Sequence, residues 1–151
     1  MEKTKFDTLK LQYEEGARII RYWIETRYKI LQFVGYFNAA VLTFGFSQSI
    51  LLSAENTIAG VAICVLSVFV SLMGLATEFS VSSYNYGYFE ALRNIEKEFG
   101  DEKNIGIITH SRETIIKSRF HELLPVHRAH KLFYSLLIIF WLIILIYQLS
   151  L

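Results

Sequence analysis

Residues 56–99 read NTIAGVAICVLSVFVSLMGLATEFSVSSYNYGYFEALRNIEKEF, and this stretch decides the fold. Its first half is apolar and uncharged, and its second half has the amphipathic pattern of a helix. No proline interrupts the stretch, and its three glycines are isolated. We therefore predict one long helix that crosses a membrane over residues 57–77 and continues into water over residues 78–99.

The rest of the chain repeats the apolar half of this pattern. Of its 151 residues, 53% are hydrophobic and 19% are charged, whereas soluble domains usually have about 25% charged residues. Three windows carry no charge: residues 30–54, 56–77 and 132–151. Each is about as long as the roughly 20 residues that a helix needs to cross a bilayer. We therefore predict an all-α polytopic membrane protein with three transmembrane helices at residues 30–49, 57–77 and 132–150.

The charged segments indicate a cytoplasmic helical bundle. We expect residues 1–29 to form a helix that packs on partner helices or, alternatively, lies flat on lipid. Residues 78–99 extend the second span, and residues 106–124 form a shorter helix that ends at Pro125. All 15 Lys and Arg lie in residues 1–29 and 78–131. The positive-inside rule therefore predicts a cytoplasmic N-terminus and a C-terminus on the far side of one membrane domain covering residues 1–151.

Small residues recur along one face of the second span at spacings of four, three, four and three. This small-residue stripe consists of Gly60, Cys64, Ser67, Ser71 and Gly74. Small residues let helix backbones approach closely in lipid, so the stripe favours a tight hairpin or a contact between subunits. A water-lined path along the serines is the alternative.

The first span has its own small and polar face. Gly35, Asn38 and Gly45 share it, and we expect the glycines to allow close packing. Asn38 is the carboxamide inside the span, whereas Gln32 and Gln48 lie near its two ends. We predict an interhelical hydrogen bond for Asn38, and a pore-lining or ligand-binding role is the alternative.

An aromatic seam is predicted along the cytoplasmic extension of the second span. Tyr84 and Tyr88 share a face with Leu92, Ile95 and Phe99. We expect this face to pack against another helix, although the tyrosines could instead stack on a ligand. The charged residues of this segment are expected mostly off the seam: Arg93, Glu96, Lys97 and Glu98.

The four histidines are the cluster tested most closely for chemistry. His110, His121, His127 and His130 fall within 21 residues, and the last two share a helix face. Because no HExxH or CxxC spacing is present, we predict no metal site. We expect interfacial and packing histidines, with a pH-responsive role for the imidazoles as the alternative.

No pattern of a catalytic site is present. The sequence has no Gly-rich phosphate loop and no paired intramembrane carboxylates, and we predict neither an enzyme nor a cofactor. The net charge of +1 gives no preference for nucleic acid. The single cysteine, Cys64, is interpreted as a packing residue within the membrane.

Several segments together resemble a known family. They are YEEGARIIRYWIETRYKIL (residues 13–31), YFEALRNIEKEFG (88–100), GIITHSR (106–112) and HRAHKLFY (127–134). Their order and spacing resemble the RipA-type family of small octameric bacterial membrane proteins. In that family, residues near Tyr13, Arg18, Arg21, Trp23 and His130 recur in similar places, whereas many members carry basic residues where this chain has Glu78. The resemblance implies a homo-octamer in the bacterial cytoplasmic (inner) membrane and does not imply an enzyme.

We therefore expect a homo-oligomeric integral membrane protein that acts as a scaffold or pore-like assembly, with membrane lipid and copies of itself as partners. The alternative is a membrane-anchored sensor or effector that binds a small molecule or a protein through its cytoplasmic helical bundle.

Overall fold

The computed structural model of the protein describes residues 3–98 and 126–150, with side chains from Asp7 onward. The described residues form α1 (Lys3–Ser47), a short 3-10 helix (Ala54–Asn56), α2 (Thr57–Glu98) and α5 (Val126–Ser150), and contain no strand. Helices within Asp7–Ser47, Ala54–Glu98 and Val126–Ser150 are long and apolar enough to cross a membrane. The all-α class and the three helices of membrane-crossing length are therefore confirmed. The predicted helix at residues 106–124 lies outside the described residues.

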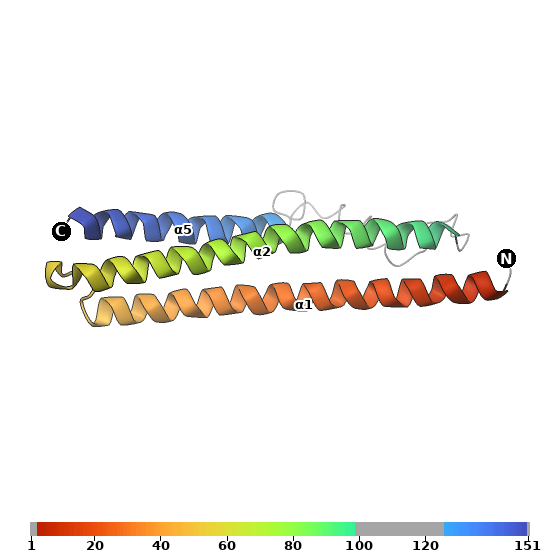
Figure 1. Ribbon diagram of the computed structural model, residues 1–151, viewed down its shortest axis with the longest axis horizontal. Coiled ribbons are helices and arrows are strands. Elements are labelled where there is room, and N and C mark those ends of the chain that lie inside the picture. Colours follow the sequence, from red (N-terminus) through yellow and green to blue (C-terminus); the bar gives the residue numbers. More distant parts are fainter. Residues whose placement is uncertain (1–2, 99–125, 151) are drawn as a thin grey trace. The chain divides into compact units, whose positions relative to one another are not determined.

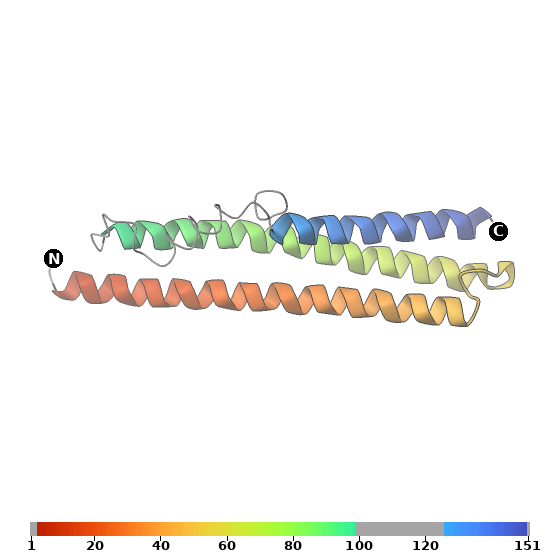
Figure 2. The same cartoon turned by 180° about the vertical axis from the view of Figure 1, so that it is seen from behind.

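The chain divides into two compact units. Unit 1 comprises Met1–Arg27 and Ser80–Val126, and unit 2 comprises Tyr28–Phe79 and His127–Leu151. Both long helices contribute to both units, because neither proline nor a helix-stopping glycine interrupts them. In unit 2, α5 lies beside the first half of α2, as the views in Figures 1 and 2 both show.

Unit 2 is held together by a buried face that repeats every three or four residues on each helix. The repeat averages 3.5 residues, as in helices that pack side by side with a left-handed supercoil. Large side chains of α5 meet small residues of α2 on this face. The buried members on α5 are His130, Tyr134, Trp141 and Gln148, and those on α2 are Gly60, Cys64, Ser67, Ser71, Gly74 and Glu78.

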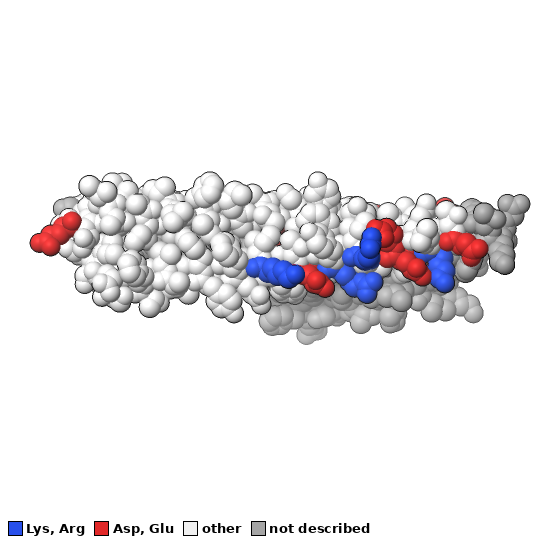
Figure 3. All heavy atoms as spheres, turned by 60° about the horizontal axis from the view of Figure 1, so that its bottom comes forward, with Lys and Arg blue, Asp and Glu red and all other residues white. Residues whose placement is uncertain are grey.

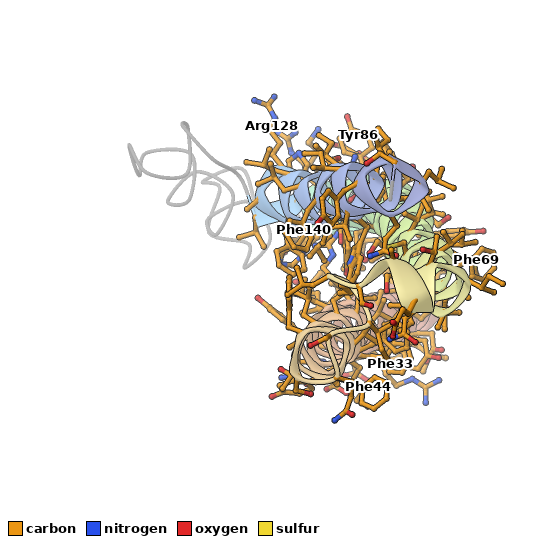
Figure 4. The ribbon with its side chains drawn as sticks, turned by 90° about the vertical axis from the view of Figure 1, so that its left-hand side faces the viewer. Phe33, Phe44, Phe69, Tyr86, Arg128 and Phe140 are labelled. Carbon is orange, nitrogen blue, oxygen red and sulfur yellow. The ribbon has the colours of Figure 1, made fainter. Side chains whose placement is uncertain are left out.

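The outward surface of unit 2 is apolar. Phe33 and Phe44 on α1 and Phe69 on α2 are each more than half exposed, and Figure 4 shows them pointing away from the helices. Figure 3 shows a broad area of this surface without charged residues. Large apolar side chains over so wide a surface are costly in water and ordinary in lipid.

A tight turn connects α1 to α2. Ser49 adopts a left-handed backbone conformation with a φ of 55°. The turn then brings Leu51 back over the end of α1, where its amide donates to the Gly45 carbonyl at 3.2 Å. A Cβ on Gly45 would lie 2.6 Å from Leu51 Cδ1, so the glycine is what allows Leu51 to be buried there.

Candidate functional site

A buried carboxylate and a histidine meet at one end of the apolar part of unit 2. Glu78 Oε2 on α2 lies 3.4 Å from His130 Nδ1 on α5, and the two side chains are 1% and 11% exposed. The two atoms are within ion-pair distance, although they do not meet the geometry of a hydrogen bond. The Tyr28 ring of α1 packs edge-on to the imidazole, with centroids 6.0 Å apart. All three helices of unit 2 therefore converge on His130.

Two basic side chains of α5 lie close to His130 along the sequence. The Lys131 ammonium lies 3.9 Å from the centre of the Phe79 ring, which is a cation–π contact between α5 and α2. Arg128 is exposed one helical turn earlier on α5, and Figure 4 shows it pointing away from the helices. His127, which we had grouped with His130, is exposed and does not share its buried position.

A polar triad lies at mid-span in unit 2. The Asn38 carboxamide donates to the Val34 carbonyl at 2.7 Å and to Ser71 Oγ at 3.5 Å. Its oxygen accepts a hydrogen bond from Trp141 Nε1. Both amide hydrogens and the carbonyl oxygen of Asn38 are thus used between α1, α2 and α5, and the side chain is buried. This is the interhelical role that the sequence predicted first, and it leaves Asn38 no exposed polar atom for a ligand.

The α2 small-residue stripe faces the other helices of its own chain. A Cβ on Gly74 would lie 2.6 Å from Tyr134 Cε1, and one on Gly60 would collide with the Gln148 side chain. Cys64, Ser67 and Ser71 are completely buried. Of the two packing roles predicted for this stripe, contacts within the chain are the ones observed. Gly35 differs, because a Cβ there would meet nothing within 4 Å in the described part of the chain.

In unit 1, the buried face of α2 shares Leu92 with the predicted aromatic seam but otherwise differs from it, and Phe99 lies outside the described residues. The most buried members of this face are Val81, Asn85, Leu92 and Glu96. Tyr84 stacks on the Trp23 ring at a centroid distance of 5.5 Å but stays 55% exposed. The seam prediction was wrong about Glu96, which we had expected off the packed face.

Glu96 is buried because a hydroxyl from α1 compensates its carboxylate. Tyr13 donates a hydrogen bond of 2.8 Å to Glu96 Oε1. Burial, followed by this hydrogen bond and by the charge of Glu96, raises the pKa of Tyr13 to about 12. The phenol therefore stays protonated and able to donate at every physiological pH.

An open groove of about 460 Å³ runs between α1 and α2 in unit 1. Its lining is almost entirely apolar and includes Tyr88, Ala91 and Ile95 of α2 and Leu11 and Ile19 of α1. At its floor, a Cβ on Gly16 would lie 2.6 Å from Leu92 Cδ2, so the two helices are in close contact there. The volume falls within the range of small-molecule pockets, and the lining suits an apolar ligand.

The sequence did not predict which side chains the buried polar residues contact on other helices. Glu78 and His130 each stood at the end of an apolar window, and a search for opposite charges at span ends would have paired them. Trp141 and Gln148 lie within the third apolar window, and the sequence pattern predicts no partner for either. Gln148 is fully buried, and its amide donates to the Ile50 carbonyl at 3.5 Å.

In the described residues, no group of three or more His, Cys, Asp or Glu is placed to hold a metal ion. His110 and His121 lie outside these residues.

No protein-family model matches the chain, and no curated protein or solved structure is significantly similar to it. Its class is therefore defined by its own features: an all-helical protein with three helices that are long and apolar enough to cross a membrane.

Proposed function

We propose that this protein is a three-span membrane scaffold that assembles from copies of itself. Its N-terminus is cytoplasmic in this proposal, because the basic residues are confined to residues 1–29 and 78–131. The resemblance in sequence favours a homo-octamer in a bacterial cytoplasmic membrane. The apolar outward surface of unit 2 supports the membrane location.

The proposal of self-assembly rests on an outward-facing set of small residues on α1. This set consists of Gly35, Ala39 and Thr43, which follow one another at four-residue spacing, and we call it the α1 open face. Nothing in the described residues comes within 4 Å of a Cβ on Gly35. Thr43 donates its hydroxyl to the Ala39 carbonyl at 2.9 Å, so it presents mainly its methyl group. Such a small-xxx-small face is the common contact between helices in lipid.

The interior of unit 2 is filled with side chains. This favours a scaffold and argues against a channel that runs through a single chain. Trp141, Tyr134 and Leu51 are each at most 1% exposed and fill the space between the helices. A water path therefore has room only between copies, which is where a pore-like assembly would conduct.

The native mass of the detergent-purified chain tests this proposal. We expect an oligomer for the wild type and a smaller species for Gly35→Leu, because leucine would hold the neighbouring helix away from the α1 open face. Ala40→Leu adds a similar side chain at an exposed position outside the α1 open face and should leave the mass unchanged. A monomeric wild type, or equal masses for the two variants and the wild type, would contradict the proposal.

A second candidate function is a membrane-anchored sensor or effector, and the groove in unit 1 favours it. A ligand for this groove would be apolar, and Tyr88 and Ala91 would contact it. Ala91→Trp should fill the groove and abolish the binding of an apolar dye while leaving the native mass unchanged. Equal dye binding by this variant and the wild type would rule out the groove as the site.

A further inference from the structure

The end of unit 2 at the level of Glu78 and His130 has an unbalanced surface charge. The charged Lys, Arg, Asp and Glu residues of unit 2 are Lys29, Glu55, Glu78, Arg128 and Lys131. Glu55 belongs to the turn at the opposite end, and Glu78 is buried beside His130. Among the described residues of unit 2, this end therefore presents three cations and no exposed anion.

Two of these cations lie next to each other along the α2–α5 side. Arg128 and Lys131 are three residues apart and are thus neighbours on the surface of α5. Lys131 is held over the Phe79 ring of α2 rather than on a carboxylate. Within residues 3–98 and 126–150, neither Lys131 nor Arg128 makes an ion pair. As far as these described residues are concerned, both cations are available to an external anion.

The surface next to these cations changes abruptly from basic to apolar. Phe79 and Leu72 on α2 are 54% and 47% exposed, and α5 continues from Lys131 into the exposed Leu132 and Leu136. A free phosphate ion would gain no favourable contact from this apolar surface. A phospholipid would, because its acyl chains can lie along α2 and α5 while its phosphate reaches the two cations.

We propose that Arg128, Lys131 and Phe79 form a binding seat for the headgroup of an acidic phospholipid in the cytoplasmic leaflet. Arg128 and Lys131 bind the phosphate, and Phe79 holds the Lys131 ammonium at the height of the headgroup. The burial of Glu78 beside His130 keeps its carboxyl group away from the lipid. This inference rests on the proposed membrane location and is independent of the number of copies.

Competition between two lipids in detergent tests the seat. The full chain is incubated with equal amounts of phosphatidylglycerol and phosphatidylcholine, separated from free lipid, and the retained lipids are counted by mass spectrometry. We expect the wild type to retain phosphatidylglycerol in excess and R128Q/K131Q to lose on the order of ten-fold or more of that preference. The matched control is R21Q/K97Q, which removes two exposed cations from unit 1 and should keep the preference.

Three results would overturn the proposal. They are an equal preference in R128Q/K131Q and the wild type, an equal loss in R21Q/K97Q, and displacement of phosphatidylglycerol by inorganic phosphate, which would indicate a site for a free anion. Membrane fractionation separates this failure from that of the proposed function. A chain that stays in the membrane without preferring acidic lipid contradicts only the seat, whereas a chain recovered without detergent contradicts both.

Discussion

In both units, several buried polar residues lie beside a polar partner from another helix. Tyr13 donates to Glu96, Asn38 joins Trp141 to Ser71, and His130 lies beside Glu78. A buried polar group costs free energy when it lacks a partner, so these contacts constrain which helix faces can meet. They therefore specify the register of the helices, because apolar contacts alone would allow several alignments along the helix axes.

Removing the Tyr13 hydroxyl should weaken unit 1. We expect Tyr13→Phe to lower the free energy of unfolding by about 1 kcal/mol, because Glu96 loses a buried hydrogen bond. Denaturant titration in detergent measures this. Tyr22→Phe removes an exposed hydroxyl from the same helix and should have no effect. Equal stability of Tyr13→Phe and the wild type would show that the bond contributes nothing.

The same contact predicts a pH dependence at the alkaline end. Because the folded pKa of Tyr13 is about 12 and its ordinary value is 10.0, the protonated phenol is the form that folding favours. The stabilisation is complete below pH 10 and is lost as the pH rises from 10 to 12. The difference in unfolding free energy between the wild type and Tyr13→Phe should follow this course. A difference that disappears below pH 10 would contradict the assignment.

The contact between Glu78 and His130 should contribute to the stability of unit 2. We expect His130→Leu to destabilise unit 2 by roughly 1–3 kcal/mol, because it replaces the polar imidazole beside a buried carboxyl group with an apolar side chain. The double variant E78Q/H130L should recover part of this loss, and thermal unfolding in detergent measures both. A double variant less stable than His130→Leu would show that the Glu78 carboxylate is stabilised by other groups.

At the scale of the helices, small residues of α2 fit large residues of α5. Gly74 receives Tyr134 and Gly60 receives Gln148, and the pairs advance in opposite directions along the two antiparallel helices. The α2 small-residue stripe is therefore filled within the chain. In the proposed assembly, a second copy therefore packs on the α1 open face instead.

Two glycines of the spans provide a matched test of this packing. Gly74→Ala should destabilise the protein by about 1–3 kcal/mol, because the new methyl group collides with the Tyr134 ring. Gly35→Ala meets no neighbouring atom and should be neutral or slightly stabilising. Melting temperatures in detergent distinguish them. Replacing Tyr134 by leucine should rescue Gly74→Ala, and equal melting of the two glycine variants would contradict the assignment of the stripe.

The sequence predicted the helices well because their signals are local. Charge-free windows and the spacing of small residues depend on one segment at a time. The partners could not be predicted in the same way. Whether Ser71 meets Asn38 or a water depends on how three helices align, and a single sequence carries no direct record of that alignment. The burial of Glu96 was missed because a glutamate among charged neighbours looks exposed until Tyr13 is placed opposite it.

At the scale of the whole molecule, the account makes a claim about topology. The basic residues lie before the first apolar window and between the second and third. If all three helices cross the membrane, the turn at Glu55 and the end of α5 lie on one side, and residues 10 and 97 lie on the other. The proposed scaffold and the acidic-lipid seat both require this arrangement.

Labelling of single cysteines in intact cells tests this claim most directly. In a Cys64→Ala background, Glu55→Cys and Ser150→Cys should react with a membrane-impermeant maleimide added outside the cells. Lys10→Cys and Lys97→Cys should react only after the cells are opened. Labelling of Lys10→Cys or Lys97→Cys in intact cells, or protection of Glu55→Cys and Ser150→Cys, would contradict the three-span topology.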